Sequence, residues 1–310
     1  MDATFCSEKL GQLTEVVKSQ PAFSLCVIVL DLLISPLTIL GNALILCVLW
    51  KTSSIPDNMK RLFLSLTLSD FAVGVLIQPA SAVIITAALS KVKNESNNLD
   101  IFCPHLLTAK MYALYFLVAA SFFTTAAIAL DRLFSVFLHL RYNQLVTEKR
   151  VRVGVVLIWF TSGLATLAYM ILPKNNEIVA VACQTTGIFV MAIAYIHLFK
   201  IVQHHKNQIR CQTQAGNCET LNAAREKKST LNAFYVFLLF LLCYLPHLIS
   251  RVILAIFKVQ SSTVTAYYAT GTLVIFNSSL NPVIYYWRYR EIRSLVKLTV
   301  KHFFCMNDRA

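Results

Sequence analysis

Charged residues are scarce in this sequence. Its 310 residues are 57% hydrophobic and only 14% charged, and the mean hydropathy is +0.62. A soluble domain of this size carries roughly 25% charged residues. Because charge is costly in hydrocarbon, a deficit of this kind is what burial in a membrane produces.

Paired cysteine motifs and a secretory leader are missing as well. The nine cysteines are scattered, with no CxxC pair and no Cys/His cluster at zinc spacing, which argues against a disulfide scaffold and a structural zinc site. The first twenty residues contain Glu, Lys and Gln throughout and lack an apolar signal-peptide core. We therefore expect the first membrane helix to direct insertion itself.

What the sequence does contain is seven long apolar runs. A hydrocarbon core of ~30 Å needs about 20 apolar residues in a helix, and the connections between the runs are short and polar. The sequence thus predicts an all-α membrane protein, a seven-transmembrane helix bundle. The expected spans are Ala22–Leu49, Leu62–Leu89, Cys103–Val136, Val151–Leu172, Ile178–Val202, Thr230–Phe257 and Ser262–Trp287.

The basic residues predict the orientation of the bundle. If the N-terminus is extracellular, most lysines and arginines fall in the three inner connections and the C-terminal tail, as the positive-inside rule requires. The net charge of +13 is then a cytosolic collar that contacts membrane lipids. This distribution argues against nucleic acid as a partner and predicts a multi-pass protein of the plasma membrane.

The segment after Trp287 has a different pattern. Ile292, Leu295 and Val296 recur at helical spacing with basic residues opposite, which predicts a short amphipathic helix on the inner leaflet. Cys305 follows it directly, either as a palmitoylation site that anchors this helix or as an unmodified thiol.

Polar residues inside the spans are costly and usually functional. Hard oxygen donors from several spans suggest a small cation such as sodium, or a hydrated network; a lone buried aspartate would instead be neutral and hydrogen-bonded. Asn42 is expected to donate to the carboxylate of Asp70. The sodium candidates are Asp70, Ser121, Asn277, Ser278 and Asn281.

Six motifs in chain order carry a family resemblance. They are Gly41-Asn42, Leu66-xxx-Asp70, Asp131-Arg132-Leu133, Trp159, Cys243-Tyr244-Leu245-Pro246 and Asn281-Pro282-Val283-Ile284-Tyr285. Together they resemble the pattern of rhodopsin-like (class A) G-protein-coupled receptors over nearly the whole chain. The resemblance implies an extracellular segment (1–21), a seven-transmembrane receptor domain (22–287) and a membrane-surface helix with a short cytosolic tail (288–310).

The resemblance also implies an activation mechanism. Arg132, beside Asp131, would pair with Glu226 and hold two helices together until helix six swings outward; the alternative is a solvated ion pair worth under ~1 kcal/mol. Pro246 removes a backbone donor and predicts a hinge in that helix. The remaining residues that the family associates with activation and coupling are Tyr195, Asn281, Pro282 and Tyr285.

Several positions depart from the family pattern. Tyr244 replaces the usual tryptophan, Gly187 replaces the helix-five proline, and Leu107 replaces the helix-three disulfide cysteine. The second outer loop, Pro173 to Glu177, is very short and has no cysteine. The missing helix-five proline, the very short second outer loop and the lost disulfide together resemble the melanocortin receptors, which group with the adenosine and lysolipid receptors.

Residues on the outer halves of the helices predict the ligand site. Tyr244, His247 and Arg251 recur on one helical face, and Lys110 adds a second cation, which suits an anionic or polar ligand. Asp31 and Gln78 offer a counter-pole; alternatively, Arg251 and Lys110 reach to the outer headgroups. Leu114 stands where amine receptors carry aspartate, and the seventh span has no lysine for retinal. The remaining candidates are Tyr115 and Tyr267.

We therefore expect a G-protein-coupled receptor that binds an extracellular ligand within the bundle and activates a heterotrimeric G protein. The expected ligand is small and polar or anionic, purine-like, lipid-like or a short peptide, and not a biogenic amine or retinal. The alternatives are a membrane transporter or channel, although no repeated halves are evident, and an intramembrane hydrolase. No enzymatic activity and no cofactor beyond an allosteric sodium ion are expected.

Two modifications are predicted on the outer side. Asn94, in Asn94-Glu95-Ser96, is the expected glycosylation site, because the other sequon begins at Asn277 inside the last span. Cys6 and Cys103 are the two cysteines that face the oxidising side, so at most one outer disulfide is expected there.

Overall fold

The computed structural model describes residues 3–52, 55–94, 99–138, 141–171, 176–213, 220–257, 260–288 and 290–307. Its side chains are described within these ranges apart from residues 3–8, 93–94, 99–104, 143, 176–177, 179, 202, 204–213, 220–236, 288 and 302–307. No strand occurs in these ranges, as the predicted all-α class requires. The elements are α1 (Ala3–Ser19), α2 (Pro21–Lys51), α3 (Asp57–Ala72), the π-helical turn η1 (Val73–Ile77), α4 (Gln78–Asn94), α5 (Leu99–Phe137), α6 (Tyr142–Leu145), α7 (Glu148–Ile171), α8 (Asn176–Thr213), α9 (Thr220–Ile256), α10 (Ser261–Arg288) and α11 (Arg290–Asn307).

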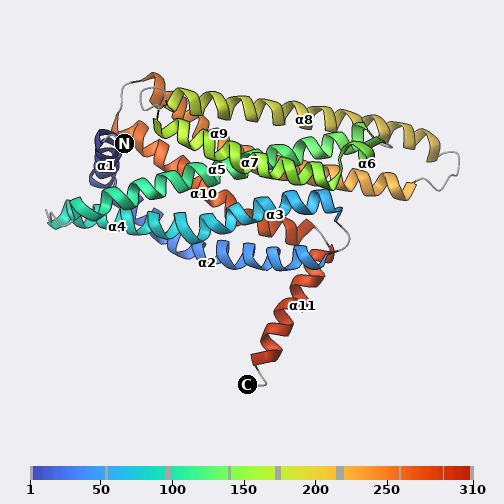
Figure 1. Ribbon diagram of the computed structural model, residues 1–310, viewed down its shortest axis with the longest axis horizontal. Helices are drawn as coiled ribbons and strands as arrows, with labels where there is room; N and C mark the ends of the chain where they lie inside the picture. Colours follow the sequence, from blue (N-terminus) through green and yellow to red (C-terminus); the bar gives the residue numbers. More distant parts are fainter. Residues whose placement is uncertain are drawn as a thin grey trace.

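The long helices form the predicted bundle, with α2, the continuous segment α3–η1–α4, α5, α7, α8, α9 and α10 lying side by side (Figure 1). Within the described residues, six of these segments are long and apolar enough to cross a membrane. The seventh, α10, is more polar because it carries Asn277, Ser278 and Asn281, which are buried in the bundle. Five of the observed segments cover their predicted spans and extend beyond them, whereas α7 and α9 begin before the predicted spans and end one residue short of the predicted Leu172 and Phe257.

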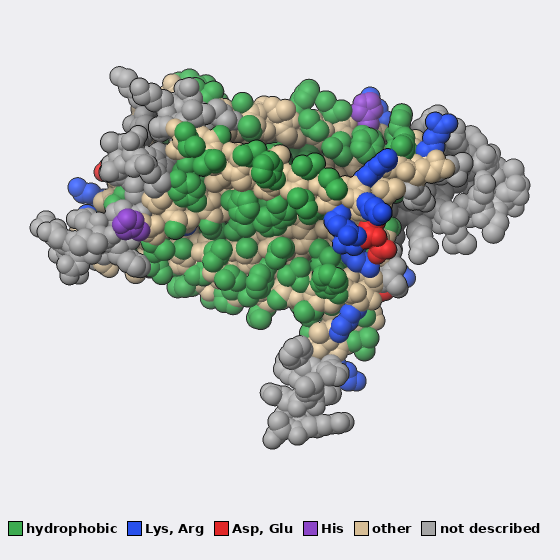
Figure 2. Space-filling view, viewed as in Figure 1, with side chains coloured by type: hydrophobic (Ala, Val, Ile, Leu, Met, Phe, Trp, Pro, Cys, Tyr) green, Lys and Arg blue, Asp and Glu red, His purple; other side chains and the backbone are tan. Residues whose placement is uncertain are grey.

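The outer surface of the bundle is apolar. Leu37 on α2 is 66% exposed and Phe160 on α7 is 63% exposed, as expected where hydrocarbon rather than water surrounds the helices. Figure 2 shows this apolar belt along the middle of the molecule, with the visible Lys and Arg side chains gathered mainly at the end where α6 lies. The positive-inside rule predicts that this end faces the cytosol.

The second membrane segment contains a π-helical turn that the sequence analysis did not predict. Pro79 lies two residues after η1, and a proline cannot donate to the preceding helical turn. One widened turn accommodates this loss. The turn packs closely on α2, because the hydroxyl of Ser35 donates to the carbonyl oxygen of Gly74 at 2.9 Å and a Cβ at Gly74 would meet Thr38 Cγ2 at 3.0 Å.

Two helices lie outside the bundle proper. The N-terminal segment, for which no element was predicted, forms α1 across the outer end of the bundle, whereas α11 projects from the opposite end (Figure 1). The predicted apolar face of α11 is observed, since Ile292 and Val296 are buried against the bundle. Arg293 joins the two helices by donating to the carbonyl oxygens of Tyr286 and Trp287 on α10, at 3.2 and 2.5 Å.

Candidate functional site

A cavity of about 490 Å³ lies among the helices toward the end covered by α1. Its walls come from α1, α2, α4, α5, α7, α8, α9 and α10. The cavity brings together residues that lie far apart in the sequence, including every predicted ligand-binding residue except Gln78. These are Asp31, Lys110, Leu114, Tyr115, Tyr244, His247, Arg251 and Tyr267.

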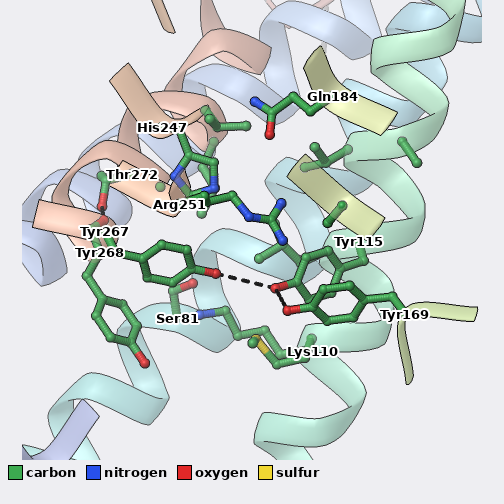
Figure 3. A pocket seen from close by; sticks show the side chains of 18 of the residues that line it. Ser81, Lys110, Tyr115, Tyr169, Gln184, His247, Arg251, Tyr267, Tyr268 and Thr272 are labelled. Carbon is green, nitrogen blue, oxygen red and sulfur yellow. Dashed lines mark hydrogen bonds between the residues drawn. The ribbon is translucent and has the colours of Figure 1, made fainter. Parts of the chain in front are cut away.

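Three tyrosine hydroxyl groups meet in this cavity (Figure 3). Tyr115 donates to Tyr169 at 2.7 Å, and its oxygen lies 3.3 Å from that of Tyr267. The guanidinium group of Arg251 lies 5.8 Å from the ring centroids of both Tyr115 and Tyr169, and Arg251 is only 6% exposed. Cation–π attraction to the two aromatic rings holds a buried guanidinium in place. Its N–H donors lie in the plane of the guanidinium and point outward from its edge.

A second cation and a carboxylate line the same cavity. Lys110 on α5 interacts electrostatically with the buried Asp31 on α2. No hydrogen bond or ion pair within 4.0 Å joins these two side chains in the described structure. Figure 3 shows the amine of Lys110 directed toward Ser81. The hydroxyl oxygen of Ser81 is buried and has no hydrogen-bond partner among the described residues.

The deeper part of the cavity is apolar and aromatic. Tyr244 stacks on Phe240 with 4.0 Å between ring centroids and also contacts Phe122. His247, one turn farther out, lies 5.1 Å from the ring of Tyr267. Tyr244, His247 and Arg251 therefore face the cavity together, as their spacing in the sequence predicted.

The prediction for Gln78 was wrong. Its side chain is 1% exposed and does not line the cavity, and its Oε1 atom has no hydrogen-bond partner in the described structure. The π-helical turn η1 ends directly before Gln78 and rotates the following residues relative to a regular α-helix. Ser81 faces the cavity from α4 instead.

The predicted sodium candidates are all buried in the centre of the bundle. Asn281 Nδ2 donates to Asp70 Oδ2 at 2.6 Å. The other carboxylate oxygen, Oδ1, and the hydroxyl oxygen of Ser121 are buried and make no hydrogen bond within 3.5 Å among the described residues, while Ser278 lies near the carboxylate and Tyr244 near Ser121. Two such oxygens are of the kind that a small hard cation binds, so the residues fit a cation, with Asn281 acting as a donor to the carboxylate.

Asn42 does not act as predicted. Its amide nitrogen donates to the carbonyl oxygens of Thr38, at 2.9 Å, and Ser278, at 3.1 Å, rather than to Asp70. The neighbouring Gly41 packs closely against α10, where a Cβ would meet Pro282 at 3.2 Å. The Gly41-Asn42 motif thus joins α2 to α10 through close packing and a hydrogen bond from the Asn42 side chain to the backbone carbonyl of Ser278.

The end of α5 that lies next to α6 carries a hydrogen-bonded acidic residue. Asp131 binds Arg132 Nη2 through Oδ2 at 2.5 Å and accepts a hydrogen bond from the hydroxyl of Tyr142 at 2.7 Å. Burial and this bond to Asp131 raise the pKa of Tyr142 above its usual range, so the hydroxyl remains a donor. Asn58 on α3 also donates to the carbonyl oxygen of Val146, at 2.6 Å, which fixes α6 from both sides.

The two activation tyrosines lie in different parts of the core. Tyr195 on α8 stacks on Phe237 with 4.3 Å between centroids, and Tyr285 on α10 packs on Phe63 at 4.9 Å. They belong to separate clusters of buried residues.

The helix α9, which contains Pro246, continues through this proline from Thr220 to Ile256.

Some predictions concern side chains that lie outside the described residues. The lock between Arg132 and Glu226, the disulfide between Cys6 and Cys103, glycosylation of Asn94 and lipidation of Cys305 are of this kind, and they stay predictions.

Sequence reasoning missed several residues of the cavity. Tyr169 on α7 and Gln184 on α8 are the most informative, because each is a polar group within an apolar span. Gln184 Nε2 donates to the carbonyl oxygen of Tyr244 at 3.3 Å. That polarity was a usable signal in the sequence, whereas the meeting of Tyr169 with Tyr115 depends on how α5 and α7 pack.

Known proteins match this chain over most of its length. A family model described as 7 transmembrane receptor (rhodopsin family) matches residues 41–187 and 175–285. The chain is 27% identical over 305 residues to adenosine receptor A2a of Equus caballus, covering 87% of this chain and 71% of the relative. It is 26% identical over 304 residues to adenosine receptor A3 of Ovis aries, covering 90% of each. Melanocortin receptor 4 of Danio rerio is 24% identical over 276 residues, covering 84% of this chain and 79% of the relative.

Proposed function

Because the chain belongs to the rhodopsin family of seven-transmembrane receptors, we propose that it binds a small extracellular ligand with an anionic group and activates a heterotrimeric G protein. The ligand site is the cavity around Arg251 and Lys110, and the G protein binds at the opposite end of the bundle, beside Arg132. The receptor lies in the plasma membrane with its N-terminus outside, and it carries no enzymatic activity of its own.

The position of Arg251 carries this proposal. Its guanidinium lies in the cavity over two tyrosine rings, and Lys110 lines the same space. Asp31 is the one carboxylate among the described lining residues, so these cations outnumber the anions there. An anion between Arg251 and Lys110 would receive charge-assisted hydrogen bonds, which are roughly twice as strong as neutral ones.

The size and lining of the cavity favour a small molecule over a peptide of several residues. Its volume of about 490 Å³ lies within the usual range for small-molecule sites, ~300–1,000 Å³. Leu114, Val118 and Phe122 supply an apolar wall, which suits the ring or chain to which the anionic group is attached.

Similarity to adenosine receptors makes purines a reasonable first probe. Adenosine is uncharged at neutral pH, whereas its 5′-monophosphate adds an anion to the same ring system. Comparison of these two molecules therefore separates recognition of the ring from recognition of the charge. The same design applies to acids and their amides, and to acidic lipids and their neutral analogues.

The experiment is a screen of such matched pairs in cells that express the receptor with a panel of chimeric G-protein reporters. We expect the charged member of a pair to be the more potent. Arg251→Gln should raise the concentration needed for half-maximal response by roughly 30-fold or more, since a lost charge pair in a buried site costs about 2 kcal/mol or more. Lys18→Gln is the matched control, because Lys18 is exposed on α1. Equal potency of charged and neutral members would refute the anion site.

We also propose that a sodium ion binds beside Asp70 as an allosteric ligand. The buried oxygens of Asp70 and Ser121 that make no hydrogen bond in the described structure support this proposal. Asn277 and Ser278, which precede Asn281 closely on α10, are buried as well. A cation would compensate the carboxylate charge, which is otherwise costly at the centre of a membrane. Asn281 would hold the second carboxylate oxygen in position, as its hydrogen bond does here.

A further inference from the structure

The N-terminal helix α1 is packed against the bundle rather than extended away from it. Leu13, Val16 and Val17 are 5%, 2% and 1% exposed, and Leu13 and Val17 belong to a cluster with Ile84 and Leu107 of α4 and α5. α1 also contacts α2 and α10. Figure 1 shows it lying across the end of the bundle. Burial of this kind holds a short helix in one place.

The same helix forms part of the ligand cavity. Leu13 and Val16 line the cavity from the outer side. The middle and the C-terminal end of α1 are joined to α10, since the hydroxyl of Tyr268 donates to the carbonyl oxygen of Lys9 at 3.5 Å and the hydroxyl of Ser261 donates to that of Ser19 at 2.9 Å. The cavity therefore has an apolar roof that comes from the N-terminal segment.

Lys9 brings a positive charge to the edge of that roof. It is only 6% exposed, and its Nζ atom lies 5.8 Å from the ring centroid of Tyr267. The hydroxyl of Tyr267 belongs to the tyrosine cluster beneath Arg251. A lysine ammonium over an aromatic face is held there by cation–π attraction, so its charge acts on the region where the tyrosine hydroxyls meet.

We propose that α1 is a structural part of the ligand site: Leu13 and Val16 roof the cavity, and Lys9, which lies behind the ring of Tyr267 and does not itself line the cavity, adds a positive charge that attracts the anionic group of the ligand. The nature of the ligand rests on the proposed function, but the roof and its charge do not. With α1 in place, the side chains of Leu13 and Val16 cover part of the cavity, so an aqueous molecule enters faster when α1 moves away. The class of ligand that fits is an anion small enough to be enclosed beneath Leu13 and Val16.

The proposal can be tested without a ligand, by measuring how fast a cysteine in the cavity reacts. Leu114→Cys places a thiol in the cavity wall, and Cys183→Ser removes a native thiol that also lines it. The probes are the anionic sulfonatoethyl and the cationic trimethylammoniumethyl methanethiosulfonates, applied from the aqueous phase to full-length receptor in lipid nanodiscs. The same receptor without Leu114→Cys gives the background.

Two variants test the roof. Deletion of residues 3–19 should raise the rate with both reagents by roughly tenfold, because reaction at a covered site follows the population that is open. Val16→Asn keeps the whole chain and loosens only the packing, so it should raise both rates in the same direction if the deletion prevents folding. Unchanged rates in Val16→Asn, or in a folded deletion variant, would show that α1 does not cover the cavity.

Charge is tested by the ratio of the two rates. Lys9→Gln should lower the anionic rate relative to the cationic rate by roughly three- to tenfold, the effect of one charge a few ångströms away in a partly shielded site. Lys18→Gln, on the exposed side of the same helix, should leave the ratio unchanged. An equal ratio in wild type and Lys9→Gln would overturn the role of Lys9. This experiment does not measure signalling. A negative result would therefore refute the role of Lys9 without showing whether anions activate the receptor.

Discussion

Gly187 on α8 and Phe122 on α5 occupy adjoining space so tightly that no side chain fits between them. A Cβ built on Gly187 would overlap Cε1 and Cζ of the Phe122 ring and would meet its Cδ1 at 3.4 Å. Phe122 in turn contacts Phe240 and Tyr244 on α9. The glycine that replaces the usual helix-five proline is therefore explained by the large ring beside it, which connects the cavity wall to the helix that carries Pro246.

Gly187→Ala should destabilise the receptor, because the ring of Phe122 must move out of a packed layer. Overpacking of this kind costs about 1–3 kcal/mol, and the thermal unfolding midpoint in detergent should fall by several degrees. Gly154→Ala on α7 is the control, since a Cβ there meets nothing within 4 Å. Phe122→Leu should restore stability to Gly187→Ala. If the double variant is no more stable than Gly187→Ala, the two residues are not in competition for space.

Tyr142→Phe removes the hydrogen bond that the α6 tyrosine donates to Asp131. Since a bond to a charged acceptor contributes more than a neutral one, we expect a loss of about 1–2 kcal/mol in stability and a change in basal nucleotide exchange. Burial and Asp131 raise the pKa of Tyr142, so the hydroxyl stays protonated and the wild-type bond persists between pH 6 and about 9. Tyr286→Phe, exposed on α10, should have no effect; equal melting curves for both variants would count against the bond.

Arg132 and Glu226 should have opposite effects when each is replaced. Glu226→Ala should raise basal signalling by releasing a restraint between helices, whereas Arg132→Ala should abolish coupling because that arginine also meets the G protein. The side chain of Arg132 is only 14% exposed and is bound to Asp131. Arg132 must therefore leave Asp131 before it can contact the G protein. Basal and stimulated nucleotide exchange in membranes measures both effects. Loss of signalling in both variants alike would show that Glu226 is not a restraint.

Sodium should lower agonist affinity in the wild type by about fivefold or more, by linkage between ligands that prefer different states. Asp70→Asn should remove this sodium dependence, since it removes the charge while nearly preserving the shape next to Asn281. The measurement compares agonist competition in sodium and in N-methylglucamine at equal ionic strength. If agonist affinity in the wild type does not change with sodium, the sodium site is refuted. Asp70 would then be a neutral member of a polar network.

Much of this architecture could be predicted from local sequence. An apolar run of sufficient length specifies a membrane helix almost by itself, and Tyr244, His247 and Arg251 share a face because helical spacing requires it. The motif residues around Asp70 and Asn281 were likewise brought together as expected. These predictions depend on periodicity and chain order, which a single sequence displays.

What could not be predicted depends on packing between helices. The turn at Val73–Ile77 changes the direction of Gln78; Pro79 indicates a disturbed helix, but the sequence does not show that the disturbance is a widened turn rather than a kink. α1 was missed because its few apolar residues are buried only by contact with distant helices. Tyr142 was not singled out in the sequence, because its role depends on the short helix α6, which brings its hydroxyl against Asp131.

The most direct test of the central claim is nucleotide exchange on purified heterotrimeric G proteins by the purified full-length receptor in lipid nanodiscs. The ligands are the matched charged and neutral pairs that emerge from the cell screen. Charged members should accelerate exchange on wild-type receptor, Arg251→Gln should require roughly 30-fold more ligand, and Arg132→Ala should give no acceleration. The account is contradicted if no G protein exchanges nucleotide faster with any of these ligands while the reconstituted protein moves them across the bilayer, because that behaviour belongs to a transporter.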